Sequence, residues 1–420
     1  MKTQKIRIIF IIFISFFLGY YFGVTKISLE WKSYKPQISI INKEPPSNVS
    51  SADFSLLWNV MQKIENSYYD KKAINAQKLL YGAVTGMVQS LDDPYTVFLP
   101  PNQNSDFKQG MAGQFEGIGA ELGMNGKQII VVAPLDGTPA KKAGIRAGDA
   151  ILKVDDKPTY GWTISQAVEK IRGQRGTKVA LTILHKGEED EKVLEIVRET
   201  ITVKSVDGWI KKVKDIDNIK TDKINNKKDI EIAYIRLSQF GDNTNQDWTA
   251  LVSKLSPRIN SGSNVKGLIF DLRNNPGGYL TDATFIASEF IKSGTVVIQE
   301  KNEADKNVFS VSREGMLTNV PVIVLINKGS ASASEIVAGA LKDHKRAKLI
   351  GETSFGKGTI QQAEDLGNGA GLHVTIAKWL TPNGTWVNGK GLNPDISVSI
   401  DKNNQKHDTQ LEKAVEELVK

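Results

Sequence analysis

The 420-residue sequence contains no cysteine and only four histidines. The absence of cysteine excludes disulfide bonds, cysteine-ligated zinc, iron–sulfur clusters and a cysteine nucleophile. It does not decide the compartment. The histidines lie in patterns that offer no convincing general base for a catalytic triad; they are His185, His344, His373 and His407. Nucleophilic chemistry in this chain would therefore call for a different base.

Concentrated basic charge is also lacking. The net charge of +7 is modest for this length, and the lysines are scattered rather than gathered on a basic helix or an aromatic–basic strip. We therefore do not expect nucleic acid as a partner; the charge fits anionic lipid or cell wall at least as well. With 40% hydrophobic residues, the chain can build a large core in two or three domains.

The N-terminus has the pattern of an export signal. Lys2, Lys5 and Arg7 precede the uncharged run IIFIIFISFFLGYYFGV at residues 8–24. The run is longer than a usual signal-peptide core and reaches the short limit of a membrane span, and no small-x-small cleavage site follows it. We expect residues 1–25 to be an uncleaved single-pass membrane anchor, with a cleaved signal peptide as the alternative. The remaining chain would lie outside the cytoplasm.

Four further segments follow the predicted anchor. Residues 26–50 are polar and read as a linker, and residues 51–105 have the spacing of two short helices. Residues 106–198 alternate short strands with two helices, which indicates a compact β-rich module. From residue 199 to residue 420, strands and long helices alternate, which indicates an α/β domain. Within it, the lysine-rich residues 211–230 predict a solvated hairpin or insertion loop.

The stretch GETSFGKGT at residues 351–359 is close to a phosphate-binding loop. Three features count against a nucleotide site. Gly358 occupies the place of the magnesium-binding Ser or Thr, the following TIQQAEDLGNG reads as a strand rather than a helix, and the apolar strand ending at Asp271 precedes the loop. A nucleotide-binding protein is thus an alternative that these residues disfavour.

Upstream, the apolar strand PVIVLI runs into SASAS and a helix that begins near Ala333. A serine at such a turn is exposed, and the free N–H groups of the first helical turn favour a developing oxyanion. Helix capping is the alternative reading. Sequence physics does not choose among Ser330, Ser332 and Ser334.

Lysine can replace histidine as the base of a serine nucleophile when burial lowers its pKa. Lys357 stands out from the 54 basic residues because small or apolar neighbours would desolvate its amine; these are Phe355, Gly356, Gly358 and Ile360. The alternative for any single lysine is a solvated charge.

Several co-linear segments together resemble the C-terminal processing peptidases, also called tail-specific proteases. They include LDDPYTVFLP (91–100), GIGAEL (117–122), APLDGTPAKKAGIRAGDAILKVDD (133–156), DLRNNPGGYL (271–280), NKGSASASEIVAGALKD (327–343), GETSFGKGTIQQ (351–362) and KWLTPNGTWVNGKGLNPDI (378–396). The resemblance implies a multidomain α/β protein with a crotonase/Clp-protease-like catalytic core (199–420), an inserted β-rich PDZ domain (106–198) and a helical N-terminal region.

The resemblance also assigns roles at the catalytic site. Ser332 matches the nucleophile, Lys357 the base and Gln361 the glutamine that positions the lysine. Backbone N–H groups of Ala333 and Gly278 match the oxyanion hole, where only a residue without Cβ lets a donor approach closely. The serines on either side of the nucleophile would be structural.

In the expected PDZ domain, Gly117, Ile118, Gly119 and Ala120 match the loop that binds a chain-terminal carboxylate, beside which a substrate adds as a β-strand. Arg172 matches an arginine that couples tail binding to the active site; a surface helix charge is the alternative.

The resemblance implies an extracytoplasmic serine endopeptidase that recognises exposed C-terminal tails and needs neither metal nor cofactor. It leaves a homo-oligomer open. Asp271 and Arg273 are expected to brace the glycine turn rather than take part in chemistry. The rival from another class is a non-catalytic PDZ scaffold that binds protein C-termini.

Overall fold

The computed structural model describes residues 13–17, 27–32, 35–40, 53–135, 137–220, 227, 229–261, 264–400 and 407–420. The chain divides into two compact units, Met1–Ala83 and Val84–Lys420, and each is described by itself. The predicted anchor lies outside the described residues except for the helical residues 13–17. In the part that is described, no helix combines the length and apolarity needed to cross a bilayer.

The described residues of the first unit comprise the helical residues 13–17, a strand pair, one full helix and the start of a second helix, α3, which continues past the unit boundary. The helices expected between residues 54 and 91 are confirmed, whereas the expected linker at 26–50 contains a β-hairpin. The physical reason is that Ile27, Leu29 and Trp31 alternate with polar residues, which is the period of a strand. The elements are β1 (Ile27–Lys32), β2 (Lys35–Ile40), α2 (Ser55–Ser67), the 3₁₀ turn η2 (Lys71–Ala73) and α3 (Ala76–Gln89).

After the end of α3, three elements of the second unit lead into the β-rich module. They are β3 (Val97–Leu99), α4 (Pro101–Met111) and β4 (Gln114–Gly117). Proline at the first helical position starts α4, because its missing N–H is not needed there. The predicted domain boundary between residues 105 and 106 falls within this helix.

The β-rich module is built as its strand pattern predicts. Its antiparallel sheet has the order β10-β9-β7-β6-β5, so β5 stands at one edge. Ile129, Ile151 and Leu181 belong to its own buried core. The elements are β5 (Ala120–Asn125), β6 (Gln128–Pro134), α5 (Pro139–Lys142), β7 (Ala150–Val154), β8 (Lys157–Pro158), α6 (Ile164–Ile171), β9 (Lys178–Leu184) and β10 (Glu191–Val197).

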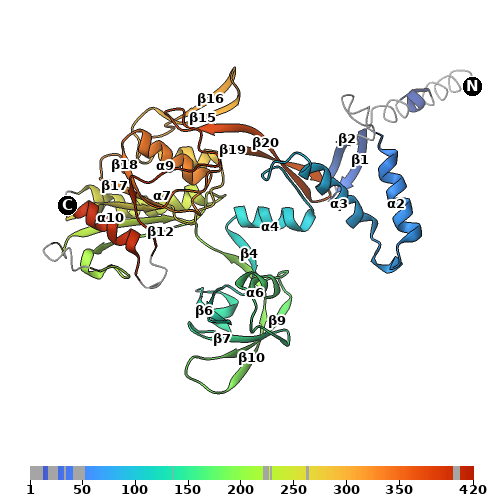
Figure 1. Cartoon of the computed structure of the whole chain (residues 1–420), viewed down its shortest axis with the longest axis horizontal. Coiled ribbons are helices and arrows are strands. Elements are labelled where there is room, and N and C mark those ends of the chain that lie inside the picture. The colour runs from blue at the N-terminus through green and yellow to red at the C-terminus, as the bar shows by residue number, and fades with distance from the viewer. Residues whose placement is uncertain are drawn as a thin grey trace, which may run out of the picture. The chain divides into compact units, whose positions relative to one another are not determined.

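The α/β domain is centred on a sheet of order β12-β13-β14-β17-β18-β21, parallel from β13 onward. Along β14, Leu268 and Phe270 join one core cluster with α7, α8 and α9, and the intervening Ile269 joins another with α10. Helices therefore cover both faces of the sheet, as buried parallel strands require (Figure 1). The elements are β11 (Glu199–Thr202), β12 (Val206–Lys212), β13 (Glu231–Leu237), α7 (Thr244–Asn260), β14 (Val265–Asp271), α8 (Leu280–Ala287), β17 (Val322–Ile326), α9 (Ala333–Asp343), β18 (Ala347–Gly351), β21 (Ile396–Ser397) and α10 (Thr409–Val419).

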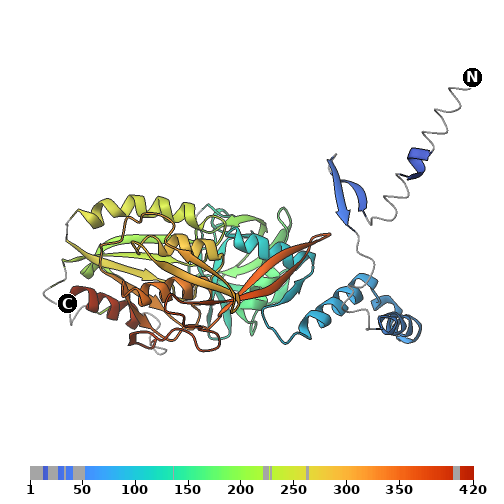
Figure 2. The same cartoon turned by 90° about the horizontal axis from the view of Figure 1, so that it is seen from above.

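A further sheet has the order β16-β15-β20-β19, with β3 added to β20. Figure 2 shows β19 and β20 as a long two-stranded ribbon that extends away from the parallel sheet. Residues 359–367 are thus a strand, as predicted, and not the helix that follows a phosphate loop. The elements are β15 (Thr295–Asn302), β16 (Asp305–Ser310), β19 (Thr359–Gly367) and β20 (Ala370–Leu380).

The expectation of a solvated hairpin or insertion loop over residues 211–230 agrees with the antiparallel pairing of β12 and β13 on either side of it, but the first part of the segment is not solvated throughout. Lys211 and Lys212 end strand β12, and the next residues form the 3₁₀ turn η3 (Val213–Asp215). Val213 is fully buried and Ile216 nearly so, because both pack in the cluster that α10 shares with the sheet. Residues 221–226 and 228 of the segment lie outside the described residues.

Candidate active site

The turn between β17 and α9 presents Ser332 in an unusual backbone conformation. Its φ of 54° and ψ of −116° lie outside the regions that L-residues ordinarily occupy, a strain typical of functional turns. The hydroxyls of Ser330 and Ser334 donate to the carbonyls of Leu272 and Asn275, each at 2.8 Å, and both serines are fully buried. The outer serines therefore fix the turn, and the half-buried Ser332 is the accessible one.

The buried carboxylate of Glu335 joins the serine turn to the loop that carries Lys357. Its Oε2 accepts the backbone N–H of Ser332 and the backbone N–H of Lys357, both at 2.9 Å. Its Oε1 accepts the Ser354 hydroxyl at 2.6 Å and the Gly356 N–H at 2.7 Å. One fully buried side chain thus fixes the backbones of the predicted nucleophile and base relative to each other.

The glycine turn after β14 lies directly against Ser332. A Cβ on Gly277 would come within 2.8 Å of Ser332 Cβ and 2.9 Å of the Ala333 nitrogen, and one on Gly278 would come within 1.7 Å of the Phe240 carbonyl oxygen. No side chain fits at either position. Among the hydrogen bonds of the described residues, none uses the N–H of Ala333 or of Gly278. Both remain available to an oxyanion.

Below this turn, an ion-pair network fixes the end of β14. The Arg273 guanidinium donates to both carboxylate oxygens of Asp271 and also to both of Asp408, at the start of α10. The Tyr234 hydroxyl donates to Asp271 as well, at 2.7 Å. The expected bracing role of Asp271 and Arg273 agrees with this geometry.

Lys357 lies in a loop held by backbone hydrogen bonds. Burial lowers the pKa of its ammonium group, and the nearby Asp93 carboxylate opposes that change. The apolar neighbours expected from the sequence do not all contribute, because the Phe355 side chain is 56% exposed. A Cβ on Gly358 would come within 2.6 Å of Trp386 Nε1. A serine or threonine of a phosphate loop would therefore not fit at this position.

Gln361 lies on β19 and does not bond the lysine in this structure. Its Nε2 donates to the hydroxyls of Thr359 at 2.8 Å and of Thr375 at 3.1 Å. Nor does any hydrogen bond of the described residues join the Ser332 hydroxyl to the Lys357 ammonium. The roles assigned to these three side chains stay predictions.

Sequence reasoning missed three groups near the lysine besides Glu335. The Tyr95 ring and the Asp93 carboxylate come from the turn before β3. His373 comes from β20, and its pKa is lowered by burial and by the charge of Lys357. Only Glu335 had a local signal, since Ser and Glu three residues apart at a helix start form a capping-box pattern.

In the β-rich module, the expected carboxylate loop joins β4 to the edge strand β5. Gly119 has a φ of 76°, and a Cβ there would come within 2.5 Å of Thr138. The carbonyls of Ile118 and Gly119 accept hydrogen bonds from Ala140 and Leu135. The loop is thereby pinned at the start of a strand whose outer edge no described strand covers.

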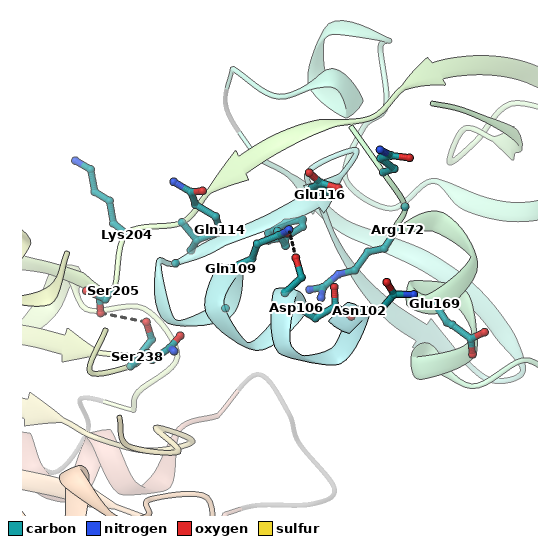
Figure 3. Close-up of a pocket in the computed structure, with 18 residues that line it drawn as sticks. Asn102, Asp106, Gln109, Gln114, Glu116, Glu169, Arg172, Lys204, Ser205 and Ser238 are labelled. Carbon is teal, nitrogen blue, oxygen red and sulfur yellow. Dashed lines mark hydrogen bonds between the residues drawn. The ribbon is translucent and has the colours of Figure 1, made fainter. Parts of the chain in front are cut away.

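Arg172, at the end of α6, lines a cavity of about 960 Å³. Its guanidinium lies 4.7 Å from the centre of the Phe115 ring, and Figure 3 shows it extending toward α4 residues that include Asp106. Ser238 and Gln239 form another wall, just before Phe240, which pairs with Gly278. The cavity thus leads from the module toward the glycine turn, and the coupling role of Arg172 stays a prediction.

Comparisons with known proteins agree with this architecture. Residues 231–398 match the model of peptidase family S41, residues 130–184 a PDZ domain, and residues 17–102 the N-terminal domain of the activating protease CtpB. The chain is 35% identical to carboxy-terminal processing protease CtpA of Bacillus subtilis over 363 residues, which are 86% of this chain and 72% of that protein. It is 34% identical to CtpB of the same organism over 386 residues, 90% of this chain and 74% of that one.

Among solved structures, a putative S41 protease from Bacteroides fragilis is similar in fold. It has 15% sequence identity and a TM-score of 0.56, with 86% of this chain and 96% of that chain covered.

Proposed function

The chain belongs to peptidase family S41 and to the carboxy-terminal processing proteases within it, and on that premise we propose that it cleaves peptide bonds with Ser332 as nucleophile and Lys357 as general base. The observation that carries this proposal is the double hydrogen bond of Glu335 Oε2 to the N–H groups of both residues. A carboxylate that binds both backbones keeps a nucleophile and its base in one geometry, and such fixed geometry is what covalent catalysis needs.

In the first step, neutral Lys357 accepts the Ser332 proton while Oγ forms a bond to the peptide carbonyl carbon. The carbonyl oxygen takes up the electron pair and is stabilised by the N–H groups of Ala333 and Gly278 and by the N-terminus of α9. The C–N bond then breaks, and Lys357 returns the proton to the leaving amine. Water, deprotonated by the same lysine, then forms a bond to the acyl carbon, the C–Oγ bond breaks, and Lys357 returns the proton to Ser332 Oγ as the new carboxylic acid product leaves.

The resting position of Gln361 defines its part in this proposal. Its Nε2 is bonded to two threonines of the β19–β20 ribbon, so its oxygen is the group that would accept from the lysine. We assign it a positioning role, because it would orient Lys357 without contacting the substrate.

Separate Ser332→Ala and Lys357→Ala variants test the dyad. Cleavage of an unstructured protein should fall at least about 1,000-fold in each, while thermal unfolding stays close to the parent. Ser330→Ala and Ser334→Ala are the comparison variants: each loses a buried hydrogen bond that holds the turn, so stability should fall, but the Ser332 hydroxyl is kept and cleavage should fall less than in Ser332→Ala. Parental cleavage rates in a folded Ser332 or Lys357 variant would show that the dyad is wrong.

Substrate capture is assigned to the edge strand β5 and the loop Gly117, Ile118, Gly119 and Ala120. The support is an open strand edge beside a pinned loop, which is the arrangement that β-augmentation uses. In the Ser332→Ala chain, a peptide with an apolar free C-terminus should bind at least about 10-fold more tightly than its C-terminal amide. Equal affinity for the free C-terminus and the amide would show that the loop at residues 117–120 does not bind the terminal carboxylate. Tail binding by a parent chain that cleaves nothing would favour a scaffold instead.

Membrane attachment outside the cytoplasm is part of the proposal and is supported by the basic flank and the apolar run of residues 8–24. Fractionation of cells that express the full chain tests it. The protein should sediment with membranes and be digested by protease added outside intact cells, and deletion of residues 1–25 should abolish both. A full chain that remains in the soluble fraction would contradict the anchor.

A further inference from the structure

The ammonium group of Lys357 faces an aromatic ring. Its Nζ lies 4.9 Å from the centre of the Tyr95 ring, a distance at which a cation is attracted to the negative face of the ring. In the described part of the chain, this ammonium takes part in no ion pair and no hydrogen bond. The ring is therefore the group that occupies the lysine in this structure.

The backbone that carries the ring is fixed by a side-chain network. The Tyr95 N–H donates to Asp93 Oδ1 at 3.0 Å, and the Thr96 hydroxyl donates to Asp93 Oδ2 at 2.7 Å. The same hydroxyl accepts the Thr375 N–H from β20 at 3.0 Å. Strand β20 pairs with β19, and β19 begins only two residues after Lys357. The turn that carries the Tyr95 ring and the loop that carries Lys357 are therefore both attached to the β19–β20 ribbon.

The charges around the ammonium also favour its protonated form. Burial alone would raise the pKa of Asp93, but hydrogen bonds from Thr375 and Thr96 outweigh it and keep the pKa below its usual range, so this carboxylate is ionised beside Lys357. Burial and then Lys357 lower the pKa of His373, so the imidazole facing from β20 is neutral.

Two further titratable groups near the lysine, among the residues that the structure describes, are Tyr95 itself and Glu335 on α9. Burial raises the pKa of Tyr95, with the charges of Glu335 and Asp93 adding to it, so the phenol keeps its proton. The Glu335 oxygens are occupied by four donors and do not bond the ammonium. Burial lowers the pKa of Lys357, and the Asp93 charge opposes that change. The ring face and the Asp93 charge are thus the groups that favour the ammonium form against burial.

We propose that Tyr95 and Asp93 are positioning residues that hold protonated Lys357 in a resting place, from which it becomes the base of Ser332 only after it gives a proton to solvent and leaves the ring. This inference rests on the proposed function of Lys357. The turn before β3 would then regulate the base, because any movement of the Tyr95 ring changes the fraction of Lys357 that is neutral and free to accept the Ser332 proton.

The test is the pH profile of kcat/KM. Tyr95→Leu keeps an apolar neighbour but removes the aromatic face, so the ammonium loses stabilisation and the acid limb should move to lower pH by roughly 0.5 to 1 unit. Tyr95→Phe is the matched control, since it keeps the ring and should leave the limb within roughly 0.3 unit of the parent. Asp93→Asn should move the limb in the same direction as Tyr95→Leu.

Lys357 can also be titrated without catalysis. In the Ser332→Ala background, the pH dependence of acetic anhydride labelling at Lys357, read by mass spectrometry, should show the same shift with Tyr95→Leu and not with Tyr95→Phe. An unchanged titration with Tyr95→Leu, or equal shifts in both variants, overturns the inference.

The two proposals fail in different ways. If the Lys357→Ala variant is active, the proposed Ser332–Lys357 dyad is wrong. If the Lys357→Ala variant is inactive but the titration of Lys357 does not shift in Tyr95→Leu, the dyad stands and only the proposed resting place on the ring is wrong.

Discussion

Replacing Glu335 by glutamine tests whether one buried carboxylate holds the catalytic geometry. The carboxylate accepts four hydrogen bonds, two at each oxygen, and the amide of glutamine keeps one oxygen and turns an NH₂ group toward the other two donors. Hydrogen bonds to a charged group contribute about 1.5–3 kcal/mol each. Two are lost, and relief of the buried charge offsets part of that loss, so the free energy of unfolding should fall by about 2–4 kcal/mol.

The effect on catalysis should exceed the effect on stability. The lost bonds release either the Ser332 and Lys357 backbones or the loop beside them, and a displacement of about 1 Å costs roughly 100-fold in rate. Urea unfolding and kcat/KM on an unstructured substrate measure the two effects.

Glu289→Gln is the matched control, because this carboxylate is also fully buried and also accepts four hydrogen bonds, but outside the site. Because one of its four donors is the Arg313 guanidinium, it should lose at least as much stability as Glu335→Gln, and it should keep kcat/KM within about threefold. If Glu335→Gln loses no more activity than this control, the link between nucleophile and base is refuted.

Two further predictions concern packing and pH. Gly358→Ala places a Cβ against Trp386 and Asn388, so the free energy of unfolding should fall by about 1–3 kcal/mol and the cleavage rate should fall. In the control Gly86→Ala, the added Cβ meets no atom within 4 Å, so urea melts should show an unchanged or raised stability. Burial raises the pKa of Asp282 to about 6. The Asp242 charge also raises this pKa, whereas a hydrogen bond from Asn245 lowers it. A raised carboxyl pKa favours the protonated folded state, so stability from this site is lost as pH rises from about 4 to 6. Asp282→Asn should therefore stabilise the protein at pH 7.5 and not at pH 4. If the urea midpoints of variant and parent are equal at both pH values, this prediction is wrong.

Much of the fold followed from local patterns. The alternation of strands and helices after residue 199, the small β-rich module and the strand after Lys357 were all predicted from periodicity and turn residues, and the structure has them. The patterns that misled were short. The hairpin β1–β2 was taken for a linker, and the buried Val213 and Ile216 were hidden among lysines.

What the sequence determined by itself was the serine turn. A strand, three alternating serines and a helix start lie within residues 321–334, so local geometry alone exposes a hydroxyl at a helix N-terminus. Spacing could not select Lys357 among 54 basic residues; its small and apolar neighbours singled it out, and the family resemblance then assigned it the role of base. Only tertiary packing brought Tyr95 and His373 to that lysine, across 262 and 16 residues of chain, and brought the lysine loop to the Glu335 carboxylate, whose bond to Ser332 is local to the helix start. Contacts of this kind depend on which strands pair and which faces are buried, and no local pattern of residues encodes that.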